Sequence, residues 1–221
     1  MSANRKLAGV IFDMDGVLID SEPVHYEATV KYLNGELGLA FNREENLEFL
    51  GRSDEYMFRI LQKRYDLPYP VPQMIERRCE IYLELLTGKV ALMPGVVKLI
   101  RDLKEDGYRL AVASSSLNRV IDTILREGEI AHYFEVIQSG EHLPYCKPRP
   151  EIFLMAAAGM KIAPGRCAVI EDTTVGIEAA RAAGMLAIAY AAPGAAAQDF
   201  SSADIVIQSF ADVNLRRALR S

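Results

Sequence analysis

The sequence predicts an α/β protein: a doubly wound parallel sheet that carries an inserted all-helical domain. Short apolar runs recur along the chain, and they are continuous rather than alternating, which is typical of strands buried on both faces. Helical patterns separate most of these runs, and such alternation favours parallel strands joined by right-handed crossovers. A long interval without strands, near the N-terminus, predicts the insertion.

Six apolar runs are predicted to be the strands, the last of them at an edge of the sheet. They are L-A-G-V-I-F (7–12), Y-R-L-A-V-A (108–113), F-E-V-I-Q (134–138), C-A-V-I (167–170), M-L-A-I-A-Y (185–190) and A-D-I-V-I (203–207). The predicted helices of the sheet domain are one between Pro94-Gly95 and Gly107, one over 117–127, one from Pro150, and one ending at Gly184. Gly184 stands where a helix commonly ends in a left-handed glycine.

The interval between the first two predicted strands is too long for a single crossover. Residues 13–107 show helical patterns, such as Tyr26, Val30, Leu33 and Leu37, and no convincing strand. A crossover helix needs far fewer residues. We therefore expect residues 20–90 to form a helical cap domain, and residues 1–19 and 91–221 to form the sheet domain.

Composition and charge exclude several classes of protein. The chain has 221 residues and a net charge of −5, with acidic and basic residues interspersed, so no stripe that would bind nucleic acid is evident. No apolar run reaches the roughly 18 residues that cross a bilayer, and no signal peptide is recognisable. The three cysteines are scattered, which is typical of reduced thiols. We expect a cytoplasmic monomer without nucleic-acid or membrane partners.

Polar side chains follow four of the predicted strands. They are Asp13 and Asp15 after the first, Ser114, Ser115 and Ser116 after the second, Lys147 beyond the third, and Glu171 and Asp172 after the fourth. Open α/β sheets bind ligands at the carboxyl ends of their strands, so we expect these side chains to lie together. Each also has a plainer explanation: acids in a turn, a serine that caps the next helix, an exposed lysine. We expect one serine to cap a helix as well, and Thr173 or Thr174 to cap the helix after Asp172.

The chemistry of this set is coherent. Several carboxylate oxygens with room for water suit Mg²⁺. A carboxylate can attack phosphorus and form an aspartyl phosphate, while a second aspartate two positions along gives a proton and later takes one. Lysine and hydroxyl groups would hold the charged phosphoryl oxygens. The sequence therefore predicts Mg²⁺-dependent phosphoryl-transfer chemistry at this edge of the sheet.

Four segments resemble the motifs of the haloacid dehalogenase superfamily. They are D-M-D-G-V-L-I-D-S (13–21), V-A-S-S-S (112–116), C-K-P-R-P (146–150) and I-E-D-T-T-V-G (170–176). They occur in the order typical of that family, and the resemblance covers essentially the whole chain. It implies a Rossmann-like core, a helical cap at the position of the insertion, and small phosphorylated metabolites as substrates.

The resemblance also implies a role for each residue of the four motifs. The implied roles are catalysis by Asp13 as nucleophile and Asp15 as general acid and base, phosphate binding by Ser114, Ser115 and Lys147, and Mg²⁺ binding by Asp13, the Asp15 carbonyl, Asp172 and, directly or through water, Glu171. In the cap, His25, Gly51 and Arg52 would meet the substrate, although a packing role for His25 stays open.

Two activities compete within this resemblance: a phosphatase of a sugar or polyol phosphate, and a β-phosphoglucomutase-like isomerase. A mutase needs a second phosphate site in its cap. In F-L-G-R-S-D-E-Y-M (49–57), Leu50 stands where the mutases carry a basic residue, and Asp54 stands where an arginine is expected. These replacements favour the phosphatase. An inactive regulatory relative is a third hypothesis, but the catalytic acids are all present.

Overall fold

The computed structural model describes residues 6–49 and 54–220. The chain divides into two units, Met1–Asp20 with Val90–Ser221, and Ser21–Lys89. We call the first the sheet unit and the second the helical unit. In the described ranges, no helix has both the length and the apolar character needed to cross a membrane.

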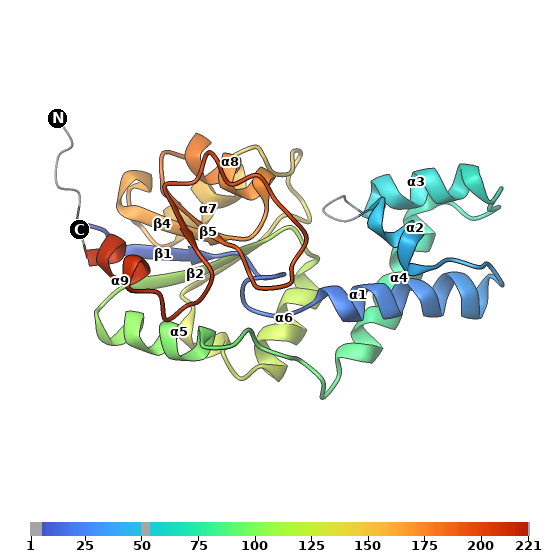
Figure 1. The fold of residues 1–221 in the computed structure, drawn as a ribbon, viewed down its shortest axis with the longest axis horizontal. Coiled ribbons are helices and arrows are strands. Elements are labelled where there is room, and N and C mark those ends of the chain that lie inside the picture. Colours follow the sequence, from blue (N-terminus) through green and yellow to red (C-terminus); the bar gives the residue numbers. More distant parts are fainter. Residues whose placement is uncertain (1–5, 50–53, 221) are drawn as a thin grey trace. The chain divides into compact units, whose positions relative to one another are not determined.

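The sheet unit is built on one parallel sheet, whose strands follow the order β3-β2-β1-β4-β5-β6 (Figure 1). The strands are β1 (Gly9–Phe12), β2 (Arg109–Ser114), β3 (Val136–Ser139), β4 (Cys167–Glu171), β5 (Leu186–Tyr190) and β6 (Ile205–Ile207). Each predicted run forms a strand, and the predicted doubly wound fold is confirmed. The strand order reverses between β1 and β4, and folds of this kind bind ligands at such a reversal.

Strand β1 lies in the middle of the sheet, with Val10, Ile11 and Phe12 fully buried. Phe12 is in register with Val112 of β2 and with Ile170 of β4. The ladder continues for one bond beyond the strand, because the Asp13 amide donates to the Ile170 carbonyl at 3.0 Å. The register therefore places Asp13 directly beside the carboxyl end of β4.

Helices cover both faces of the sheet. They are α5 (Val96–Glu105), α6 (Asn118–Glu127), α7 (Glu151–Gly159), α8 (Thr174–Ala182) and α9 (Val213–Arg220), with short 3₁₀ turns at Ala131–Tyr133 and Pro164–Arg166. Helices α7 and α8 lie on one face, and α5, α6 and α9 on the other (Figure 1). The face under α7 and α8 is lined by small side chains such as Ala111 and Ala187. Small side chains let these helices pack close to the strands.

The helical unit contains α1 (Glu22–Val30), the π-helix η1 (Lys31–Glu36), α2 (Arg43–Leu47), α3 (Asp54–Arg64) and α4 (Val71–Leu86). Its apolar core includes Leu33, Phe58, Leu61 and Ile81. The predicted apolar face of the first helix is only partly right, because Leu33 is buried while Tyr26, Val30 and Leu37 are half-buried. The π-helix adds residues to the turn, so the 3.6-residue period fails there.

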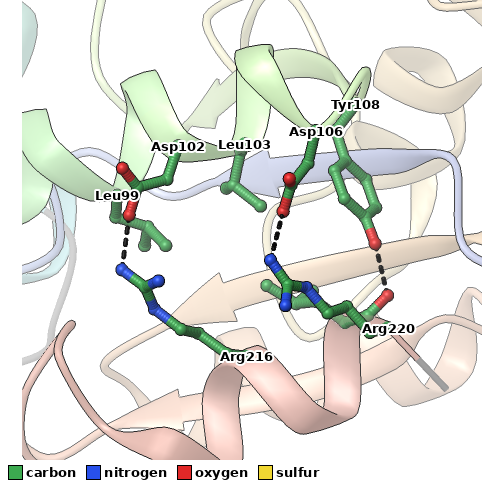
Figure 2. A pocket seen from close by; sticks show the side chains of 8 residues that line it. Leu99, Asp102, Leu103, Asp106, Tyr108, Arg216 and Arg220 are labelled. Atoms are coloured by element: carbon green, nitrogen blue, oxygen red, sulfur yellow. Dashed lines mark hydrogen bonds and ion pairs between the residues drawn. The ribbon is translucent and has the colours of Figure 1, made fainter.

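Helix α9, which the sequence did not predict, packs on α5 through two arginines spaced one turn apart (Figure 2). Arg220 pairs with Asp106 at 3.0 Å, Arg216 pairs with Asp102, and the Tyr108 hydroxyl donates to the Leu219 carbonyl. The hollow between these groups has a volume of about 20 Å³. It holds one water at most, so this seam is a packing contact and not a ligand site.

Candidate active site

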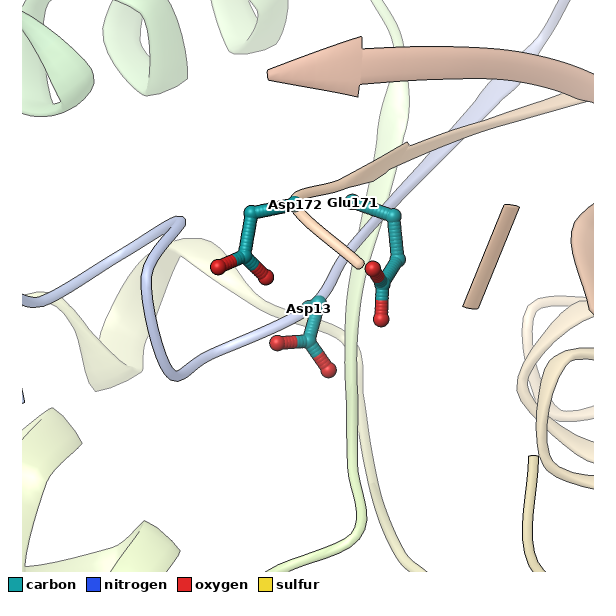
Figure 3. A group of neighbouring side chains, drawn as sticks. All are labelled: Asp13, Glu171 and Asp172. Atoms are coloured by element: carbon teal, nitrogen blue, oxygen red, sulfur yellow. The ribbon is translucent and has the colours of Figure 1, made fainter. Parts of the chain in front are cut away.

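Three carboxylates meet where the strand order reverses (Figure 3). Asp13 follows β1, Glu171 ends β4 and Asp172 follows it, and one oxygen of each acid lies within 4.8 Å of an oxygen of the other two. Asp13 is 6% exposed and Glu171 is 1% exposed. Buried carboxylates are costly without compensating charge, so this arrangement requires a positive partner.

Lys147 supplies positive charge to this cluster from the loop after β3. Its Nζ donates to Asp13 Oδ1 at 2.5 Å and to Glu171 Oε1 at 2.8 Å, and its side chain is only 7% exposed. The ammonium also lies 5.0 Å from the centre of the Phe153 ring on α7. Burial by itself would lower the pKa of Lys147, but Asp13 and Glu171 outweigh it and hold that pKa above its ordinary value. Lys147 is therefore a buried cation, not the exposed loop lysine of the plainer reading.

One lysine does not balance the acids. Burial, with smaller contributions from the neighbouring Glu171 and Asp15, raises the pKa of Asp13 to about 7 against the opposing effect of Lys147. Burial and the charges of Glu171 and Asp13 also raise the pKa of Asp172 well above its ordinary value. Both shifts arise first from burial and then from the neighbouring carboxylates, which leave negative charge in excess of the one lysine in contact with them. A divalent cation would offset that excess.

The geometry around Asp172 fits a metal ion. Asp172 Oδ1 is buried and has no hydrogen-bond partner among the described residues. Its other oxygen packs against the backbone of Gly16, where an added Cβ would lie 2.0 Å from Oδ2. Hard carboxylate oxygens are the donors that Mg²⁺ takes. The residues present therefore fit the predicted cation.

A second glycine makes room for Glu171. A Cβ on Gly176, in the first turn of α8, would lie 1.9 Å from Glu171 Cδ and 2.0 Å from Oε1. Glu171 Oε2 meanwhile accepts from the Thr173 amide at 2.6 Å and the Thr173 hydroxyl at 2.8 Å. Thr173 also caps α8 through Gly176, as predicted. Both oxygens of Glu171 are thus held by the protein.

We expect Gly176→Ala to lower kcat/KM at least tenfold and to destabilise the fold by about 1–3 kcal/mol, as overpacking does. Alanine ordinarily stabilises a helix by about 1 kcal/mol relative to glycine, but at position 176 its methyl group would displace the Glu171 carboxylate. Gly35→Ala is the matched control, because nothing lies within 4 Å of the added Cβ. Thermal melting and steady-state kinetics measure both effects. A Gly176→Ala protein as stable and active as the control would contradict this steric argument.

The serines after β2 divide their roles. Ser116 Oγ donates to Asp15 Oδ2 at 2.9 Å, and the buried Ser114 hydroxyl accepts from the Ser116 amide at 3.1 Å. Ser115 is exposed. The expectation that a serine caps the next helix is wrong: Leu117 occupies the N-cap position of α6. The last serine, Ser116, lies one residue before this N-cap position. The Asn118 amide in the first turn of α6 donates to the Glu141 side chain at 2.9 Å.

Sequence reasoning missed the contact of Ser116 with Asp15 and the support behind it. Ser139, at the end of β3, donates its hydroxyl to the Ser116 carbonyl at 2.6 Å and accepts from the Glu141 amide at 3.0 Å. Ser139 is 7% exposed. The signal was available, because a serine that ends a buried parallel strand lies at the ligand-binding edge of the sheet.

Of the predicted cap residues, Gly51 and Arg52 lie outside the described residues. His25 lies in the helical unit, where its ring stacks on Tyr82 with centroids 4.2 Å apart and its Nδ1 lies 2.6 Å from a guanidinium nitrogen of Arg78. Sequence reasoning missed Arg78, which is 6% exposed and also donates to Asp54 at 2.9 Å. A buried arginine thus joins His25 and Asp54, which the sequence places far apart.

Comparison with known proteins agrees with this geometry. The family model described as haloacid dehalogenase-like hydrolase matches residues 10–190. Hexitol phosphatase B of Escherichia coli K12 is 31% identical to this chain, and the match covers 99% of this chain and 100% of that protein. The β-phosphoglucomutase of Bacillus subtilis is 32% identical, over 95% of this chain and 92% of that protein.

Among solved structures, CbbY from Rhodobacter sphaeroides in complex with phosphate superposes with a TM-score of 0.83. It is 28% identical, over 93% of this chain and 96% of that one. The family model covers well over half of this chain, and the relatives match it almost from end to end. The protein belongs to the haloacid dehalogenase-like hydrolase family.

Proposed function

We propose that this protein is a Mg²⁺-dependent phosphatase of a small phosphorylated metabolite, a sugar or polyol phosphate, and that it acts through an aspartyl phosphate on Asp13. The observation that carries the proposal is the contact of the buried Lys147 with both Asp13 and Glu171 at the reversal of strand order. A buried nucleophile beside a fixed cation is arranged for an anionic substrate. The phosphatase names of several relatives agree with it.

The first half of the reaction transfers the phosphoryl group to the protein. Lys147 engages Asp13 Oδ1, so we assign the attack on phosphorus to Oδ2. The new Oδ2–P bond forms as the ester P–O bond breaks, and Asp15 gives its proton to the leaving oxygen. Ser116 donates to Asp15 Oδ2 at 2.9 Å and so holds this carboxyl group in place.

The second half releases phosphate. Water attacks the phosphorus of the aspartyl phosphate while Asp15 takes the proton of that water, and the Oδ2–P bond breaks to regenerate Asp13. Asp13, Asp172 and the Asp15 carbonyl would hold Mg²⁺, whose charge, when bound, offsets the carboxylates and the phosphoryl oxygens. We assign Glu171 to orienting Lys147, because both of its oxygens already accept hydrogen bonds. Lys147, with Ser114 and Ser115, would hold the transferred group.

We assign the helical unit, Ser21–Lys89, the role of a cap that selects the substrate. Within it, the positive charge of Arg78 is engaged by Asp54 at 2.9 Å, and its guanidinium also contacts His25. A buried arginine engaged in this way is not offered to a second phosphate. Asp54 also stands where the resemblance to the mutases leads us to expect an arginine, so that basic group is missing from this position. Both features favour a phosphatase over a mutase.

The decisive test compares two products. With Mg²⁺ present, we expect phosphate release from hexitol and hexose phosphates to be at least about tenfold faster than isomerisation of β-glucose 1-phosphate, a difference of about 1.4 kcal/mol in barrier. Free phosphate and glucose 6-phosphate are measured in parallel, with and without a catalytic bisphosphate. Rapid, bisphosphate-dependent isomerisation with little phosphate release would establish the mutase instead.

A further inference from the structure

The segment after β5 is tied to the start of α8 by one glutamine. Gln198 Oε1 accepts from the Thr174 amide at 3.1 Å and from the Thr174 hydroxyl at 2.9 Å. The same hydroxyl accepts from the Asp199 amide at 3.0 Å. Three hydrogen bonds therefore converge on one threonine from a segment 24 to 25 residues away in the sequence.

These bonds satisfy groups that a helix by itself leaves open. The first amides of an α-helix have no partner within the helix. In α8, Thr173 Oγ1 accepts from the Gly176 amide at 3.1 Å, and Gln198 accepts from the Thr174 amide. The loop 191–199 therefore supplies a second capping acceptor, for the Thr174 amide, in addition to the local cap by Thr173. Gln198 is half-buried, which protects these bonds in part from competing water.

The anchored turn is the one that carries the acids of the active site. Thr173 precedes the anchored residue and donates twice to Glu171 Oε2, at 2.6 and 2.8 Å. The other oxygen of Glu171 accepts from Lys147 at 2.8 Å. Asp172 lies between these two anchors in the sequence. The turn is thus held at one end by Lys147 and at the other by Gln198.

We propose that Gln198 is a positioning residue of the active site, which anchors Thr174 and so holds Glu171 on Lys147 and Asp172 beside Asp13. The inference rests on the proposed function and deepens it, because it adds the loop after β5 to the elements that set the geometry of the site. Gln198 acts through Thr174 and touches none of the reacting groups. Loss of the acceptor oxygen should therefore loosen the turn without removing any chemical group from it.

Two replacements of equal length separate the acceptor from the bulk of the side chain. Gln198→Met removes the oxygen, and Gln198→Glu retains two oxygens that can accept from Thr174. We expect Gln198→Met to lower kcat and weaken Mg²⁺ binding by about tenfold, the lower end for a group that supports a metal ligand. KM should change less than twofold, and Gln198→Glu should restore most of the loss. Gln208→Met, at an exposed glutamine of the sheet unit, is the control.

Amide hydrogen exchange measures how firmly Gln198 holds this turn, and it does so independently of catalysis. In Gln198→Met, the amides of residues 172–176 should exchange faster than in the wild type, while Gln198→Glu and Gln208→Met keep them protected. Unchanged exchange in Gln198→Met, or equal loss in both Gln198 variants, would overturn the anchor whatever the activity. A wild-type protein without Mg²⁺-dependent phosphate release would contradict the proposed function instead, and the exchange rates would still decide on Gln198.

Discussion

Asp13→Asn is expected to reduce the turnover number at least a thousandfold, a barrier increase of about 4 kcal/mol. The amide keeps the shape of the side chain but removes the attacking anion and one proposed metal ligand. The loss should be the same for an alkyl phosphate and for p-nitrophenyl phosphate, because neither can be cleaved without the nucleophile. Phosphate release at saturating substrate and Mg²⁺ is the measurement.

Two further variants make this result specific. In single-turnover measurements of leaving-group release, Asp15→Asn should slow the cleavage of p-nitrophenyl phosphate much less than that of an alkyl phosphate, since a nitrophenolate departs without a proton while an alkoxide needs one. Hydrolysis of the aspartyl phosphate, in which Asp15 takes the proton of water, should be slowed equally for both substrates. Asp20→Asn, an exposed aspartate near the same turn, should retain wild-type turnover. An Asp13→Asn protein with more than a tenth of the wild-type turnover would rule out the covalent role of Asp13.

Removal of the metal should have the second largest effect. We expect a chelator to abolish phosphate release, and added Mg²⁺ to restore it, because Asp13, Glu171 and Asp172 otherwise repel the phosphate and one another. Asp172→Ala should weaken Mg²⁺ binding at least a hundredfold, the upper range for a group that tunes a metal site. Calorimetric titration with Mg²⁺ measures this binding in the absence of substrate.

The control for Asp172 is Asp122→Ala, which removes an exposed carboxylate from α6 and should leave Mg²⁺ binding unchanged. Melting curves should show that Asp172→Ala remains folded, because the variant removes a half-buried carboxyl group whose pKa is already raised. Full activity in excess chelator, or equal Mg²⁺ affinity in both variants, would be incompatible with the proposed metal site.

Local sequence was sufficient for the sheet and for the ends of its strands. Buried parallel strands are continuous apolar runs, and a run such as V-I-F ends where Asp13 begins, so the strand and its polar end are read together. Strand order was not needed to find the edge, because the carboxyl ends of all parallel strands lie on the same side. This rule predicted that four side chains lie together at the same edge of the sheet: Asp13, Lys147, Glu171 and Asp172.

Elements that are stabilised by residues distant in the sequence could not be predicted from local sequence patterns. Helix α9 is held by ion pairs of Arg216 with Asp102 and of Arg220 with Asp106, each pair separated by 114 residues in the sequence. The pattern V-N-L-R-R-A-L-R does not indicate which segment these arginines contact. The π-helix after Val30 moved the buried face of the helical unit off the predicted period. The cap of α6 came from Glu141 rather than from the serines beside it.

The sequence by itself determined the chemical groups of the site and the edge of the sheet on which they meet, because strand ends and residue types are local properties. Only the tertiary structure decided how those groups are held. It shows that Lys147 donates hydrogen bonds to Asp13 and Glu171, and that the Ser139 hydroxyl donates to the Ser116 carbonyl. It also shows that Gln198 accepts from Thr174 and that Arg78 donates to Asp54. Such contacts depend on loops that the fold brings together across tens of residues, and no periodicity in the chain records which loops those are.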